Sequence, residues 1–228
     1  MDYLQYFIFG IYPYIALTIF LLGSLVRFER EQYTWRSEST QMIHRGQLRL
    51  GSNLFHIGII GVFLGHLGGL LTPMVVWQAL GVTHEAKQIL AMTAGGILGG
   101  LGIIGLLILL YRRFSNERLA AMTPMRDKVL LLWLLVTLGL GLLTIPLSMA
   151  HLNGDMMVMF MEWAQRIVTF RGDAAPFVIG SPLVFQLHIF FGMTFFIIFP
   201  FTRMVHVWSG FASVTYLGRA WQLVRPRA

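Results

Sequence analysis

Long apolar stretches alternate with short polar segments along most of this chain. An α-helix needs about 20 apolar residues to cross a bilayer, and five stretches are that long. They lie at residues 4–26, 51–78, 89–111, 129–150 and 183–208. The pattern predicts an all-α integral membrane bundle of five transmembrane helices, forming a single domain over residues 1–228.

Two further segments fit this plan. The first apolar stretch has no cationic segment before it and no convincing cleavage site, so we expect a retained span rather than a signal peptide. Residues 151–182 form the longest loop between spans, and residues 156–170 within it are apolar except for a cluster of polar side chains. This segment is typical of a short helix that lies in the membrane interface.

Composition supports the membrane assignment. Charged residues make up 12% of the chain, against about 25% in soluble domains. Mean hydropathy is +0.69. The absence of cysteine excludes disulfides, iron–sulfur clusters held by this chain, cysteine-bound zinc and covalently attached haem. Any metal cofactor must therefore be held by His, Met or carboxylate side chains.

The net charge of +7 is distributed unevenly between the two sides of the predicted bundle. Of the 17 Lys and Arg residues, all but Lys87, Arg166 and Arg171 lie in the loops after spans one and three or near the end of span five. Cationic loops remain in the cytoplasm. We therefore expect an outward-facing N-terminus, a cytoplasmic tail at 209–228, and a charge that reflects membrane orientation rather than nucleic-acid binding.

Four of the seven histidines lie inside predicted spans, where polar side chains are costly and usually functional. His56 and His66 belong to span two, and His188 and His206 to span five. These spans run antiparallel, which pairs His56 with His206 near the cytoplasm and His66 with His188 toward the outside. No role is assigned to the remaining histidines, His44, His84 and His151.

A cofactor held between two helices fits these pairs. His56 and His66 are separated by about 15 Å of helix rise, and His188 and His206 by about 27 Å. A cofactor that can tilt, together with a bend at Pro200, would absorb this difference. Haem b meets the requirement because its iron takes an imidazole from each face. Two haems with irons roughly 20 Å apart would then connect the two sides of the membrane.

Simpler roles for the histidines remain open. A single buried histidine often only hydrogen-bonds between helices, whereas two matched pairs favour a ligand role. Zinc is disfavoured because each pair supplies only two ligands. A proton-relay transporter would normally show buried acids beside the histidines.

The glycines and one lysine also allow two readings. Glycines of spans two and three, including the row Gly61, Gly65 and Gly69, are typical of closely packed helices. Gly65 and Gly69 flank His66, so they would also leave room for a macrocycle or a flat substrate ring. Lys87 is most simply an interfacial lysine that reaches water. Alternatively, it donates to a quinone oxygen beside the outer haem.

Several motifs together resemble one family, the gamma subunit of respiratory membrane-bound nitrate reductase, which is a di-haem cytochrome b subunit. The similarity covers nearly the whole chain, from the first span to the tail. It is carried by the segments IYPYIA, QYTWRS, SNLFHIGIIGVFLGHLGGLLTP (52–73), GLLTIPLS (141–148), QLHIFFGMTFFIIFPFTRMVHVWS (186–209) and YLGRAWQLVRPR.

The resemblance implies a multi-pass protein of the bacterial cytoplasmic membrane with two non-covalent b haems. His56 and His206 would bind the inner haem, and His66 and His188 the outer haem. Quinol would be oxidised near the outer haem, at Lys87 with Gly65 and Gly69 close by. Electrons would pass to an iron–sulfur beta subunit and then to a molybdenum-containing alpha subunit, which reduces nitrate to nitrite.

Two other hypotheses remain. A related quinol-linked cytochrome b could serve a different cytoplasmic reductase, of the heterodisulfide- or sulfite-reductase type. A cofactor-free membrane anchor or a histidine-based transporter would also contain buried histidines, but it would be uncoloured.

Overall fold

The computed structural model describes residues 3–31, 47–150 and 152–208. Over these residues the chain is helical, with no strand. The predicted tail at 209–228, most of the cationic loop after span one with His44, and His151 lie outside the described residues.

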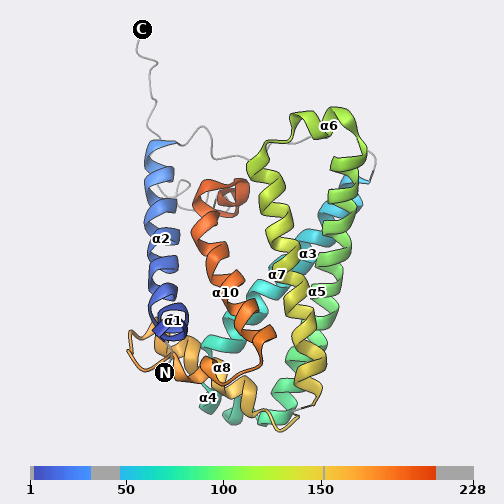
Figure 1. Ribbon diagram of the computed structural model, residues 1–228. Helices are drawn as coiled ribbons and strands as arrows, with labels where there is room; N and C mark the ends of the chain where they lie inside the picture. Colours follow the sequence, from blue (N-terminus) through green and yellow to red (C-terminus); the bar gives the residue numbers. More distant parts are fainter. Residues whose placement is uncertain (1–2, 32–46, 151, 209–228) are drawn as a thin grey trace, which may run out of the picture.

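Five helical segments are long and apolar enough to cross a membrane, which confirms the predicted fold class. Figure 1 shows them side by side in a bundle, with α3 crossing obliquely behind α7 and α10. The first segment combines α1 (Tyr3–Tyr6), the π-helical turn η1 (Phe7–Ile11) and α2 (Tyr12–Arg30). The other four are α3 (Leu48–Leu71), α5 (His84–Ser115), α7 (Met125–Met149) and α10 (Leu183–Ile198), the last extended by η3 (Phe199–Phe201).

Short helices close the two ends of the bundle. Helix α6 (Glu117–Met122) lies at the end where α2 finishes, which we name the inner end after the predicted orientation (Figure 1). Helices α4 (Met74–Ala79) and α8 (Asp155–Val168) lie at the opposite, outer end. Helix α9 (Pro176–Ile179) follows α8. Helix α8 matches the interfacial helix predicted at residues 156–170.

Two helices end earlier than their apolar stretches. Helix α3 stops at Leu71 rather than at 78, just before Pro73. Helix α10 stops at Ile198 rather than at 208, just before Pro200. Proline has no N–H to donate and its ring crowds the preceding turn, so it ends each helix although the apolar sequence continues. The chain goes on as the separate helix α4 in one case, and as η3 and η4 (Arg203–Val205) in the other.

Helices α3 and α5 cross with their backbones in contact. A β-carbon built at Gly58 would lie 2.3 Å from the amide nitrogen of Gly102, and one at Gly105 would lie 2.2 Å from that of Phe55. Only glycine allows this approach, so the packing interpretation of these glycines is correct. By contrast, α10 packs mainly against α7 and α2 and is not among the close neighbours of α3.

Candidate functional site

The four histidines of the predicted spans form two pairs. In each pair one histidine comes from α3 and the other from α10 or from the segment that follows it. The ring centroids of His56 and His206 are 6.2 Å apart, and those of His66 and His188 are 5.9 Å apart. The alternation of the spans predicted these same pairs. His66 and His188 thus join α3 to α10, two helices that do not pack closely on one another, whereas His206 of the inner pair follows η4.

Each imidazole is held by one hydrogen bond from its Nδ1 atom to a backbone carbonyl. A carbonyl oxygen can only accept, so Nδ1 carries a proton, and in the neutral imidazole Nε2 then has the lone pair. Such bonds orient histidines that bind metals. The acceptors for His56, His66, His188 and His206 are the carbonyls of Ser52 (2.7 Å), Val62 (2.8 Å), Thr137 (3.1 Å) and Arg203 (2.6 Å).

This donor set fits haem iron. Metal–imidazole bonds are about 2 Å long, so two imidazoles on opposite sides of one metal have ring centroids about 6 Å apart. The described residues include no group of three or more His, Asp or Glu side chains suited to a metal ion. A haem held by such a pair would take one nitrogen from each histidine, and its porphyrin would supply the other ligands to the iron.

The inner pair depends on a chain segment that is not α-helical. After α10 ends, Arg27 of α2 donates from Nη1 to the carbonyls of Pro200 (2.6 Å) and Thr202 (2.8 Å). Arg203 forms an ion pair with the carboxylate of Asp127 on α7 (2.8 Å), whose side chain is only 4% exposed. His206 immediately follows this fixed segment. Sequence reasoning missed both arginine contacts, and the only available signal was Pro200.

The outer pair is backed by a glycine on α7. A β-carbon at Gly141 would lie 2.9 Å from Cε1 of His188, so the imidazole occupies the space that a side chain would take. Gly65 and Gly69, in contrast, border open space. A β-carbon built at either position meets no atom of another described element within 4 Å. These two glycines do not serve helix packing in this structure.

Lys87 lies in the first turns of α5 with its ammonium directed into the protein. The residue is 4% exposed, which does not fit a lysine that reaches for water. Its Nζ donates to the carbonyl of Gly69 (2.7 Å) and to Sδ of Met161 (2.9 Å), with Sδ of Met157 at 3.7 Å. The ring of Trp77 is 5.2 Å away. No acidic side chain of the described residues forms an ion pair with Lys87.

Proline explains why the Gly69 carbonyl is available. In a continuous helix it would accept from residue 73, but Pro73 has no N–H. Phe9 has the same relation to Pro13, and its carbonyl accepts from Nε1 of Trp163 on α8 (2.9 Å). Helix α8 also supplies Gln165, which donates to the carbonyl of Leu70 at the end of α3 (3.0 Å). Side chains thus bind backbone carbonyls that a proline leaves without a donor or that lie at the end of α3.

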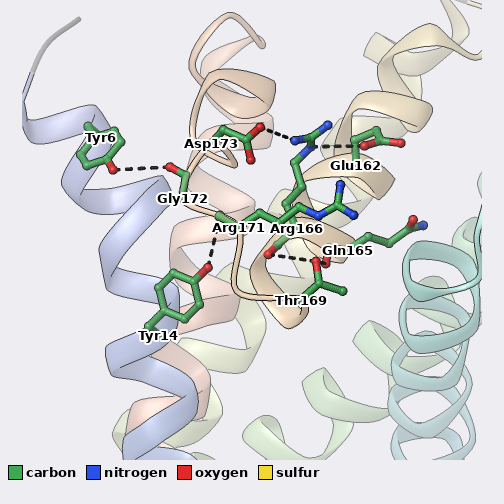
Figure 2. Close-up of polar contacts among 9 residues, drawn as sticks. All are labelled: Tyr6, Tyr14, Glu162, Gln165, Arg166, Thr169, Arg171, Gly172 and Asp173. Carbon is green, nitrogen blue, oxygen red and sulfur yellow. Dashed lines mark hydrogen bonds and ion pairs between the residues drawn. The ribbon is translucent and has the colours of Figure 1, made fainter.

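Figure 2 shows how α8 is fixed to the loop that follows it. Arg166 forms ion pairs with Glu162 (3.3 Å) and Asp173, and its hydrogen bond to Asp173 holds the pKa of that carboxyl below its usual range. The hydroxyl groups of Tyr6 and Tyr14 donate to the loop carbonyls of Gly172 and Arg171, at 3.5 Å each. The polar cluster noted in the sequence therefore anchors α8 at the outer end.

Comparisons with known proteins agree along the whole chain. The family model for the nitrate reductase gamma subunit matches residues 5–227. The chain is 47% identical to the respiratory nitrate reductase 1 gamma chain of Escherichia coli (strain K12), over 100% of both chains. It is 48% identical to the respiratory nitrate reductase 2 gamma chain of that strain, over 100% of this chain and 99% of the relative. Identity to the nitrate reductase gamma chain of Bacillus subtilis (strain 168) is 35%, over 97% and 98% of the two chains.

Proposed function

This chain belongs to the nitrate reductase gamma subunit family, and from that premise we propose that it is the quinol-oxidising, di-haem cytochrome b subunit of a respiratory nitrate reductase. It is a multi-pass protein of the bacterial inner membrane. In this proposal the chain takes electrons from membrane quinol at its outer end and delivers them to partner subunits at its inner end. The site that reduces nitrate lies on another subunit.

The two histidine pairs are the observation that carries the proposal. His56 and His206 hold the inner haem b, and His66 and His188 hold the outer haem b. The carbonyl bonds at Nδ1 orient each ring, and in the neutral imidazole they leave the Nε2 lone pair for a metal. Bound between such imidazoles, haem iron supplies reversible one-electron transfer.

Quinol oxidation is assigned to the neighbourhood of Lys87. Its ammonium donates a hydrogen bond to a quinol oxygen, while the open space at Gly65 and Gly69 admits the flat ring. Oxidation of one quinol to quinone releases two electrons and two protons. Because this region lies at the outer end, the protons leave on the side opposite to the cationic loops, and the reaction contributes to a proton gradient.

The inner end is assigned to partner binding. A gamma chain implies other subunits, and we assign an iron–sulfur beta subunit and a molybdenum-containing alpha subunit to the cytoplasmic side. The cationic loops there provide a positive surface that suits docking of a protein with complementary charge.

The proposal is tested by counting haems in the purified complex. A pyridine haemochrome spectrum should give two b haems per chain. His66→Ala should reduce this to one, whereas His84→Ala, outside the pairs, should leave two. Absence of haem from a haem-replete preparation, or an unchanged count in His66→Ala, would refute the assignment.

A second measurement tests the quinol reaction and the partners. Lys87→Ala should keep both haems but lose most quinol-dependent nitrate reduction. Copurification of a molybdenum enzyme supports a nitrate reductase. Quinol oxidation coupled only to another acceptor would instead favour a related cytochrome b serving a different reductase.

A further inference from the structure

We infer that Met161 is a positioning residue for the quinol reaction, because its thioether and the Gly69 carbonyl together fix the direction of the Lys87 ammonium. The inference rests on the proposed function and assigns a role to α8, which the sequence indicated only as an interfacial helix. Met161 is 2% exposed, and it lies between the end of α3 and the first turns of α5.

The hydrogen-bond capacity of Lys87 limits how it can bind a ligand. An ammonium group has three N–H donors. Two are used by the Gly69 carbonyl at 2.7 Å and by Sδ of Met161 at 2.9 Å. The third donor is directed toward Sδ of Met157 at the longer distance of 3.7 Å, so it makes the weakest of the three bonds. A quinol oxygen, which is a stronger acceptor than a thioether, would take this third donor.

A thioether suits this role better than a stronger acceptor would. A carboxylate beside Lys87 would form a charge-assisted bond and compete with the substrate oxygen. Sulfur is a weak acceptor that carries no charge, so it orients the ammonium while leaving its positive charge uncompensated. Among the described residues the other neighbours of Nζ are also uncharged: Sδ of Met157 at 3.7 Å and the ring of Trp77 at 5.2 Å.

The positions of both acceptors are set by the fold. Pro73 leaves the Gly69 carbonyl without a helical donor, as described above. Met161 is held in place because the turn of α8 that follows it is attached to other helices. Trp163 donates to the carbonyl of Phe9 at 2.9 Å, and Gln165 donates to the carbonyl of Leu70 at 3.0 Å.

Substitutions on α8 test the inference in the complete, membrane-extracted complex. Met161→Leu keeps the apolar volume but removes the acceptor, whereas Met161→Gln restores an uncharged acceptor of similar length. Met159→Leu is the matched control, because residues two apart point to different sides of a helix. Steady-state oxidation of a menaquinol analogue is measured for each variant with nitrate as the acceptor, together with haem content.

Met161→Leu should raise the KM for the quinol about three- to ten-fold, since one weak hydrogen bond is lost, with kcat and haem content nearly unchanged. Met161→Gln should recover most of the wild-type KM, and Met159→Leu should resemble the wild type. A wild-type KM in Met161→Leu, an equal effect in Met159→Leu, or no recovery in Met161→Gln would overturn the inference.

These outcomes are separable from failure of the proposed function. If the wild-type complex oxidises quinol and Lys87→Ala does not, but Met161→Leu behaves as wild type, only the role of Met161 is rejected. If the wild-type complex does not oxidise quinol, the proposed function itself fails.

Discussion

The ring of His188 is placed by contacts on two sides. One contact is the hydrogen bond from Nδ1 to a carbonyl, and the other is the surface on which the ring lies. For His188 that surface is the bare backbone of α7 at Gly141. A side chain at this position would compete directly with the imidazole, so the position of the ring depends on a residue 47 places earlier in the chain.

Gly141→Ala should therefore disturb the outer pair. The added β-carbon would lie 2.9 Å from Cε1 of His188, and overpacking of this kind typically costs about 1–3 kcal/mol. We expect a lower content of the outer haem, or a shift in its optical spectrum, with the inner haem unchanged. Reduced-minus-oxidised spectra of the purified complex measure both effects.

The matched control is Gly139→Ala on the same helix. A β-carbon at Gly139 meets no atom of another described element within 4 Å. The haem spectrum of the Gly139→Ala variant should therefore be that of the wild type. Equal spectra for both variants would show that the ring of His188 does not depend on Gly141.

At the scale of helices, prolines create acceptors that other elements then use. Pro73 frees the Gly69 carbonyl for Lys87, and Pro13 frees the Phe9 carbonyl for Trp163. Around Pro200 the chain leaves the helix, and Arg27 binds the carbonyls of Pro200 and Thr202. Unsatisfied backbone groups are costly in a membrane. At each of these three positions a side chain from a distant part of the sequence therefore binds the backbone.

Asp127→Asn should loosen the segment that carries His206. The variant removes the negative partner of Arg203, and breaking a buried ion pair from one side costs about 3–5 kcal/mol. We expect a lower melting temperature of the chain and a changed spectrum or midpoint potential of the inner haem. Asp155→Asn, at an exposed position on α8, is the control and should change neither.

A stability loss without any change at the inner haem would mean that Asp127 supports packing of α7 alone. Equal effects in both Asp variants would show that general charge loss, rather than the contact with Arg203, is responsible.

At the scale of the whole molecule, the bundle has two chemically different ends. Among the described residues, the inner end carries most of the cationic side chains and the Arg203–Asp127 pair. The outer end carries α4 and α8 (Figure 1) and the start of α5 with Lys87. One histidine pair lies toward each end. The function proposed here requires that these ends face opposite sides of the membrane in the predicted direction.

Cysteine labelling tests this orientation, because the natural chain contains no cysteine. Phe170 in the loop after α8 is 83% exposed, and Met122 at the end of α6 is 65% exposed. In spheroplasts, a membrane-impermeant maleimide should label Phe170→Cys and should label Met122→Cys only after denaturation in detergent. The reverse result would invert the orientation and place quinol oxidation on the cytoplasmic side.

The histidine pairs show how far sequence reasoning extends. Their partners followed from counting spans, since antiparallel helices bring residues at similar depths together. The sequence separations gave a helix rise of about 15 Å between His56 and His66 and of about 27 Å between His188 and His206, and these two rises do not match. The structure adds that the helix carrying His188 ends at Ile198, so His206 lies on a separate turn rather than on a continuous helix. The apolar pattern continued past Pro200 and therefore could not mark this end.

The sequence by itself determined the helical class, the five spans and the pairing of the histidines, because a chain in lipid must satisfy its backbone hydrogen bonds within each span. Only the tertiary structure decided that Met161 contacts Lys87, that Asp127 contacts Arg203 and that Gly141 backs His188. Each of these contacts joins residues on different helices. The rotation and tilt of these helices depend on how neighbouring helices pack against one another. The periodicity of a single helix does not contain that information.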